Sequence, residues 1–154
     1  MKKILTFLVC VLLSGCSVQP PRIAQTESGW PEVVLSGAIK ERAVHDTILL
    51  NLVSAGYQVE ADNGSYLKFS RQMNRAEEAG RRAVNGGDPG TFRDEVVVTI
   101  VRTSAGIRVL VQPAWSKGVR GQKIQELKTD NEDFNSWQTF LFRLRDRISQ
   151  KSGS

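Results

Sequence analysis

The sequence predicts an α+β fold: a two-layer sandwich in which an antiparallel sheet of four to five strands carries two helices on one face. Two long segments repeat apolar residues every three or four positions, as amphipathic helices do. Two pairs of alternating segments meet at turn-forming residues, as the strands of β-hairpins do. The length of 154 residues, with 40% hydrophobic and 24% charged residues, suits one globular domain.

The first half of the folded region is predicted as a strand, a helix and a hairpin. Residues 32–36 form a short β-like run. Residues 38–55 repeat apolar side chains at helical spacing and end before a glycine, which is a common helix stop. Residues 57–70 alternate on either side of Asn63-Gly64, a dipeptide that strongly favours a two-residue hairpin turn.

The second half is predicted as an insertion, a second hairpin and a C-terminal helix. Residues 72–91 are polar and longer than a hairpin needs; residues 73–84 fit a short polar helix, and we expect the insertion as a whole to be mobile. Residues 92–112 alternate around a Ser-Ala-Gly turn. Residues 117–128 fit either a loose strand or a turn of helix. From Thr129 an acidic start leads into a helix. Its apolar stripe consists of Phe134, Trp137, Leu141, Leu144 and Ile148.

The N-terminus has the pattern of an export signal. Two lysines precede an apolar run of about ten residues, which is too short to span a bilayer. The run ends in Leu13-Ser14-Gly15-Cys16, and these residues resemble the lipobox of bacterial lipoproteins. The resemblance implies cleavage between Gly15 and Cys16, a diacylglycerol thioether on Cys16, and acylation of the new amino terminus. Two or three acyl chains anchor a protein durably in a membrane, because each buried methylene contributes about 0.8 kcal/mol.

The same resemblance divides the chain. We expect residues 1–15 to be a cleaved signal peptide, residues 16–31 to be the lipidated N-terminus and a flexible tether, and residues 32–151 to be a single α+β domain. In Gram-negative lipoproteins an Asp after the cysteine commonly signals inner-membrane retention, so Ser17 implies the periplasmic face of the outer membrane. In plan the chain is similar to accessory lipoproteins of the barrel-assembly machinery or the lipopolysaccharide-export translocon. This similarity implies an envelope protein partner.

Few residues suit catalysis or metal binding. After cleavage of the signal, Cys16 is the only cysteine, which excludes a disulfide, a cysteine nucleophile and a thiolate metal site. His45 is the only histidine. We expect Asp46 to lie outside its reach, because adjacent helical residues diverge by about 100°. We therefore predict that the protein is not an enzyme and has no cofactor and no metal. Export also makes a nucleic-acid partner implausible.

Three features are candidate contacts with a partner. Trp115, Lys117 and Arg120 follow a strand end and combine an aromatic ring with cations. Arg81 and Arg82 lie in the insertion and suit an acidic surface. The third feature is the sheet face away from the helices, which mixes apolar and polar groups. Its residues are Val97, Thr99, Val101, Arg108 and Leu110.

Three functions are compatible with these features. The first is a non-enzymatic, lipid-anchored envelope lipoprotein whose periplasmic domain binds or supports a protein partner. The second is a carrier or sensor that binds a lipid or amphiphile between the sheet and the helices, in a cavity lined by Trp115, Trp137 and Phe134. The third is an envelope hydrolase that uses His45. Only the first requires nothing beyond what the sequence contains.

Overall fold

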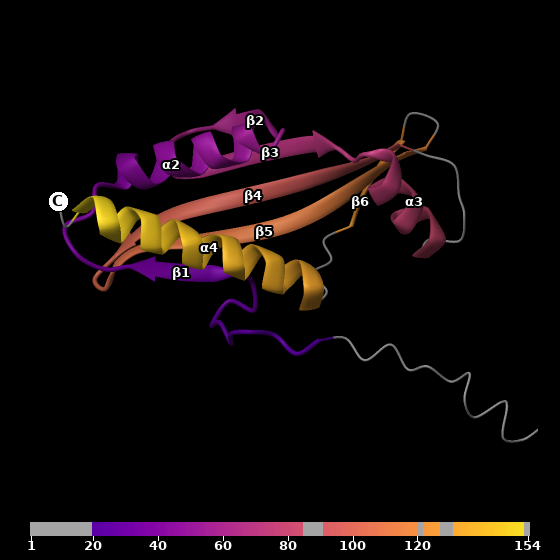
Figure 1. Ribbon diagram of the computed structural model, residues 1–154. Helices are drawn as coiled ribbons and strands as arrows, with labels where there is room; N and C mark the ends of the chain where they lie inside the picture. The colour runs from indigo at the N-terminus through magenta and orange to yellow at the C-terminus, as the bar shows by residue number, and fades with distance from the viewer. Residues whose placement is uncertain (1–19, 85–90, 120–121, 127–130, 153–154) are drawn as a thin grey trace, which may run out of the picture.

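The computed structural model describes residues 20–84, 91–119, 122–126 and 131–152, and it confirms the α+β fold (Figure 1). The helices are α2 (Glu41–Ser54), α3 (Arg75–Val84) and α4 (Asn131–Ser152). The strands are β1 (Glu32–Leu35), β2 (Gln58–Asp62), β3 (Tyr66–Gln72), β4 (Thr91–Thr103), β5 (Gly106–Val119) and β6 (Gln122–Glu126).

The described strands form one antiparallel sheet in the order β1-β5-β4-β3-β2, and β6 pairs with the end of β5 beside this path. The path of five corresponds to the predicted sheet of four to five strands. The additional strand, β6, comes from the segment 117–128, for which the sequence left strand and helix open. Its partner is the stretch of β5 from Trp115 to Val119.

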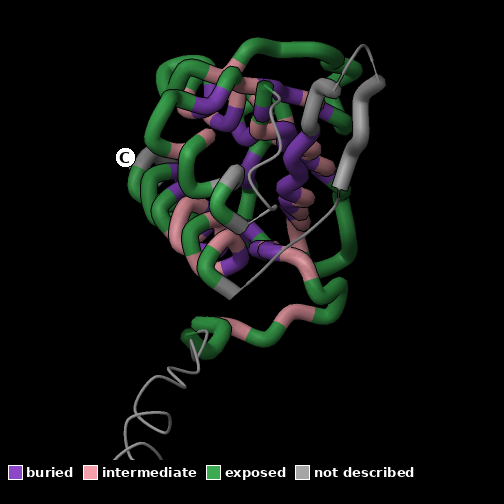
Figure 2. Tube along the Cα trace, turned by 90° about the vertical axis from the view of Figure 1, so that its right-hand side faces the viewer, coloured by how far each residue is buried: buried purple, intermediate pink, exposed green. Residues whose placement is uncertain are grey.

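Two helices, α2 and α4, cover one face of the sheet, as predicted (Figure 1). They share a single core with the strands beneath them, and the buried positions in Figure 2 lie between the two layers. The helical contribution consists of Val44, Ile48, Leu52, Leu141, Leu144 and Ile148. Full burial of such a side chain contributes about 1.5–3 kcal/mol, so this core is the main favourable term in folding. None of the described helices is both long enough and apolar enough to cross a membrane.

Alternation along β4 separates the two faces of the sheet. Val96 and Val98 are buried under the helices, whereas Val97 is half-buried and Val101 exposed on the outer face. Thr99 shares the outer face of β4, and the β4–β5 register pairs Leu110 with Thr99 and Arg108 with Val101. An antiparallel sheet commonly leaves one face in water, so this arrangement by itself does not indicate a partner.

The insertion predicted at residues 72–91 contains α3 in its described part. A capping box starts this helix: the Asn74 side-chain oxygen accepts the N–H groups of Ala76 and Glu77, both at 3.0 Å. The Glu77 carboxylate accepts the Asn74 N–H in return, at 2.7 Å. Asn74 and Glu77 thus accept hydrogen bonds from backbone N–H groups that have no partner within the first turn of the helix. The sequence signal for this start is the spacing Asn74-x-x-Glu77.

Residues 20–31, which the sequence assigns to a flexible tether, lie against α4. Asn135 donates to the Pro21 carbonyl at 3.0 Å and accepts the Ile23 N–H at 2.8 Å. Gln138, one helical turn later, binds the backbone of the first residue of β1 in the same way. The proline content of residues 20–31 predicts an extended chain. It does not predict that two side-chain amides of α4, those of Asn135 and Gln138, bind the backbone of this segment and of the start of β1.

Candidate functional site

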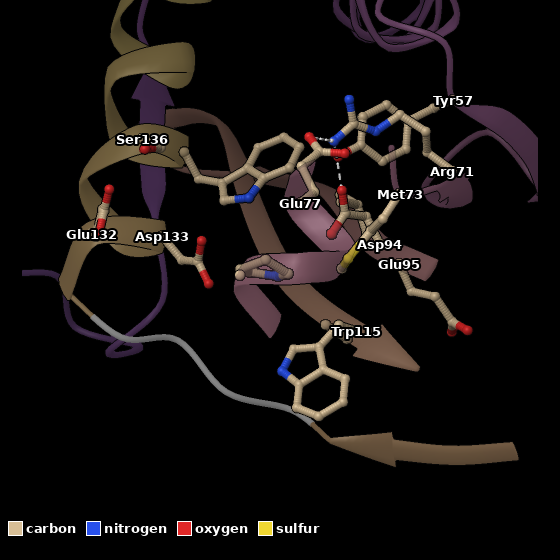
Figure 3. Close-up of a pocket in the computed structure, with 15 residues that line it drawn as sticks. Tyr57, Arg71, Met73, Glu77, Asp94, Glu95, Trp115, Glu132, Asp133 and Ser136 are labelled. Carbon is tan, nitrogen blue, oxygen red and sulfur yellow. Dashed lines mark hydrogen bonds and ion pairs between the residues drawn. The ribbon is translucent and has the colours of Figure 1, made fainter. Parts of the chain in front are cut away.

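A groove of about 570 Å³ opens on the helix side of the sheet, between α3 and the start of α4 (Figure 3). The groove exists because the strands of the sheet extend further than the helices that cover them. The 13 residues of β4 extend for about 43 Å, whereas the 14 residues of α2 rise only about 21 Å. The long β4–β5 hairpin therefore continues past the helix layer, as Figure 1 shows. A volume of this size is typical of ligand sites.

Aromatic side chains form much of the groove. Trp137 of α4 contacts Tyr57 edge-on, with ring centres 6.3 Å apart. On the floor, Trp115 packs against Phe92 with ring centres 5.8 Å apart, and Met73 completes this small cluster. Trp115 and Trp137 both line the groove, and Figure 3 shows the Trp115 ring on its floor. These rings provide a preformed apolar surface with few rotatable bonds to order on binding.

An ion-pair network crosses one side of the groove. The Arg71 guanidinium donates to Asp94 at 2.6 Å and to Glu77 at 2.9 Å, as the dashed lines in Figure 3 show. Arg71 and Asp94 are direct cross-strand neighbours in the β3–β4 register. The guanidinium also lies 5.1 Å from the centre of the Tyr57 ring. Burial raises the pKa of Tyr57 to about 12, so its phenol remains neutral at physiological pH.

The charged side chains described along the groove are mainly acidic. Glu77, Asp94, Glu132 and Asp133 line it, with Arg71 as the basic group described among its lining residues. Glu95 also borders the groove, but its carboxylate points away in Figure 3 and lies 3.4 Å from the Lys68 ammonium. The groove therefore combines an aromatic floor with an acidic rim. This combination suits apolar groups that alternate with cations.

A second groove of about 400 Å³ runs between α2 and α4. It shares Tyr57, Ser136 and Trp137 with the first, so the two meet at these side chains. Arg143 and Arg147 line the second groove, which is thus basic where the first is acidic. Together the grooves are longer than a single small-molecule site requires.

The predicted contact residues have different positions. Trp115 is only 5% exposed and belongs to the groove floor, not to the open surface. Arg81 and Arg82 are in the last turns of α3, and Lys117 is in β5, but their side chains are outside the described part of the structure. Arg120 lies outside the described residues altogether. Contacts by these four residues stay predictions.

The cavity predicted for an amphiphile also differs from the groove. Trp115 and Trp137 line the groove, as that prediction requires. Phe134 instead is fully buried on another side of α4, where the Arg22 guanidinium lies 4.4 Å from its ring centre. Helical periodicity places Phe134 and Trp137 on one stripe, but it does not show that residues 20–31 cover the first of them.

His45 binds two carboxylates. Its Nδ1 lies 2.9 Å from Asp46, and its Nε2 lies 3.0 Å from Asp62 at the end of β2. The expectation that Asp46 is out of reach is wrong: the Cα–Cβ bonds diverge, but side-chain torsions bring the carboxylate back beside the ring. The hydrogen bond to Asp46 raises the pKa of His45, burial opposes the rise, and Asp62 adds to it.

This arrangement connects α2 to the β2–β3 hairpin and does not resemble a catalytic group. A general base needs one imidazole nitrogen that can accept a proton from the nucleophile. Both nitrogens of His45 face carboxylates, so neither is available in this geometry. Among the residues that the structure describes, no group of three or more potential ligands is arranged to hold a metal ion.

Comparison with known proteins assigns no family. No family model matches the chain, and no curated protein is significantly similar to it. The groove and the resemblance of the N-terminus to a lipobox are therefore the features from which a function can be inferred.

Proposed function

We propose that this chain is a non-enzymatic, lipid-anchored envelope lipoprotein whose periplasmic domain binds an extended segment of a protein partner in the groove. The resemblance of Leu13-Ser14-Gly15-Cys16 to a lipobox supports the anchor. These residues lie outside the described part of the chain. The single observation that carries the binding function is the aromatic, acid-rimmed groove over β4 and β5.

The chemistry of the groove favours a polypeptide with apolar and basic side chains. Tryptophan and tyrosine dominate the energetics of many protein interfaces because each buries a large area at a small entropic cost. Tyr57 and Trp137, which are half-buried in the free domain, supply such surface above the buried Trp115. Glu132, exposed at the start of α4, offers a carboxylate to a lysine or an arginine.

A lipid or amphiphile is the second candidate, favoured by the apolar floor formed by Met73 and Trp115. The charge argues against an anionic lipid in the first groove. Its phosphate would lie near the carboxylates of Glu77, Asp94 and Glu132. Opposed like charges reduce affinity unless a cation separates them. A cationic or zwitterionic amphiphile is compatible with the site.

The experiment compares two peptides on the detergent-solubilised full-length protein, one alternating leucine with lysine and one alternating leucine with glutamate. Ser136→Arg adds bulk and positive charge where the grooves meet, and Ala43→Arg adds the same group to an exposed position of α2. We expect the lysine peptide alone to bind saturably. Ser136→Arg should weaken it at least about tenfold, or 1.4 kcal/mol, and Ala43→Arg should not.

Two results would contradict the proposal. Equal binding of the two peptides would show that the acidic rim does not select the ligand. An unchanged affinity in Ser136→Arg would show that the peptide binds elsewhere. Displacement of the lysine peptide by a zwitterionic lysophospholipid at low micromolar concentration would favour the amphiphile as the natural occupant.

The anchor has its own test. In a Gram-negative host we expect the wild type in the outer-membrane fraction, and Cys16→Ala released from it. Intact-mass analysis should show diacylglycerol and acyl chains such as palmitate on Cys16. Identical fractionation of the two proteins would remove the anchor from the proposal.

A further inference from the structure

Residues 20–31 fix the place where the chain leaves the domain. Pro20 borders a shallow hollow on α4 together with Glu132, Asn135, Ser136, Thr139 and Arg143, so the hollow has a carboxylate at one end and a guanidinium at the other. The apolar stripe of α4 faces the sheet, so this hollow is on the opposite side of the helix. A helix about 10–12 Å in diameter therefore separates Pro20 from the sheet.

Three contacts hold the segment there. The amide of Asn135 binds the backbone of Pro21 and of Ile23, at 3.0 and 2.8 Å. The Arg22 guanidinium, between them in sequence, lies over the Phe134 ring and donates to the Gly29 carbonyl at 2.9 Å. Release of Pro21 breaks one bond to Asn135, and release of the chain beyond Ile23 breaks both.

The distance to the proposed anchor is short. Three residues separate Cys16 from Pro20, and this stretch spans at most about 14 Å when fully extended. The headgroup region of one leaflet takes up roughly 6 Å of that length. Pro20 is therefore within about 8 Å of the headgroup surface, which is close to the Debye length at physiological ionic strength.

The α4 surface beside Pro20 carries exposed arginines. Arg143 borders both the hollow and the second groove, and Arg147 follows one turn later. Arg147 donates to Asn51 at 2.7 Å, which holds its guanidinium near the helix surface. Guanidinium groups bind phosphate oxygens well, and at this separation the negative surface potential of a membrane attracts them.

We propose that the outer strip of α4, at Thr139 and Arg143, faces the membrane, and that Arg143 and Arg147 contact anionic lipid headgroups while Glu132 lies at the groove end of the strip. This inference rests on the proposed anchor at Cys16. The first groove then opens at membrane level, where a periplasmic segment of an integral membrane protein would enter it. The outer face of the sheet, with Val101 exposed, is directed away from the bilayer.

The test measures which side of the domain is close to lipid. The lipidated full-length protein is reconstituted into vesicles of phosphatidylcholine and phosphatidylglycerol that contain a headgroup-nitroxide lipid. Thr139→Cys on α4 and Thr99→Cys on the outer sheet face are a matched pair of half-buried threonines. Each variant carries one fluorophore, because Cys10 leaves with the signal and Cys16 is blocked by lipid. Ser136→Cys supplies a second reporter on the same strip.

We expect quenching at residues 139 and 136 to be at least about twice that at residue 99. Asn135→Ala should reduce this difference, because it frees a longer stretch of chain. If the vesicles float with the protein but residue 99 is quenched as strongly, the orientation is wrong and the anchor stands. If the protein does not float with the vesicles, the anchor and the orientation both fall.

Discussion

Gln138→Met tests the attachment of the N-terminal strand to α4. Gln138 is 1% exposed, and its side-chain oxygen accepts the Glu32 N–H at 3.0 Å while its amide donates to the Glu32 carbonyl at 2.8 Å. Both backbone groups belong to β1 at the edge of the sheet. Methionine has a similar volume and helix propensity but cannot replace either hydrogen bond.

The expected loss follows from the two bonds. Each bond between partly buried neutral groups contributes about 0.5–1.5 kcal/mol net, so the pair contributes roughly 1–3 kcal/mol. We expect the free energy of unfolding to fall by about 2 kcal/mol. With a urea m-value of about 2 kcal/mol/M, the midpoint of unfolding should decrease by about 1 M at an unchanged m-value.

Urea unfolding followed by far-UV circular dichroism measures this loss. Gln112→Met is the matched control, since Gln112 is half-buried on the outer sheet face, and we expect a change within about 0.5 kcal/mol there. A loss below about 0.5 kcal/mol in Gln138→Met, or an equal loss in Gln112→Met, would refute the reasoning. The first result would mean that β1 is held by the sheet and the core alone.

Two further predictions concern the backbone and the histidine. Gly106 has a φ of +137°, and a Cβ there would collide with the carbonyl oxygen of Leu35. Gly106→Ala should therefore lower the free energy of unfolding by about 3 kcal/mol, whereas Gly80→Ala, in open space on α3, should raise it by up to about 1 kcal/mol. Equal changes of the two variants in urea unfolding would contradict this geometry. Because Asp46 raises the pKa of His45, the contribution of His45 to stability is complete below about pH 6.5 and is lost as pH rises through the folded-state pKa. The stability advantage of the wild type over His45→Gln should shrink between about pH 6 and pH 9, and an advantage that stays constant or grows would show that the carboxylate contacts do not favour the charged ring.

Local patterns in the sequence predict most of the fold. The helical spacing of Val44, Ile48 and Leu52 identifies the buried side of α2. A hairpin turn forms at the predicted place, but it spans residues 63–65 instead of two residues: Gly64 has a φ of +86°, and the Asn63 side chain accepts the Tyr66 N–H at 2.8 Å. These features depend on residues close in the chain, so periodicity and turn chemistry are sufficient.

The features that the sequence does not predict depend on contacts between distant segments. Asp62 reaches His45 only because the β2–β3 hairpin packs beside α2. Asn135 binds a segment more than a hundred residues earlier in the chain. No spacing rule reports such pairs.

The sequence predicts the groove only in part. The sequence predicts the second strand of the long hairpin only over residues 107–112, about 20 Å, so the continuation of β5 to Val119 past the helix layer is not predicted. Composition does show that Trp115 and Trp137 are available. It does not show that α3 and Arg71 form a wall beside them, because that wall depends on the path of the insertion.

Site-specific photo-crosslinking in intact cells tests the central claim most directly. A photoreactive residue replaces Ser136 in the groove or, as the control, Ala43 on α2, in chains with Cys16 and with Cys16→Ala. The account predicts that position 136 crosslinks to one membrane protein, that position 43 does not, and that the crosslink is lost in Cys16→Ala. Equal crosslinking from both positions, or a crosslink that persists without Cys16, would contradict an anchored domain that binds its partner in the groove.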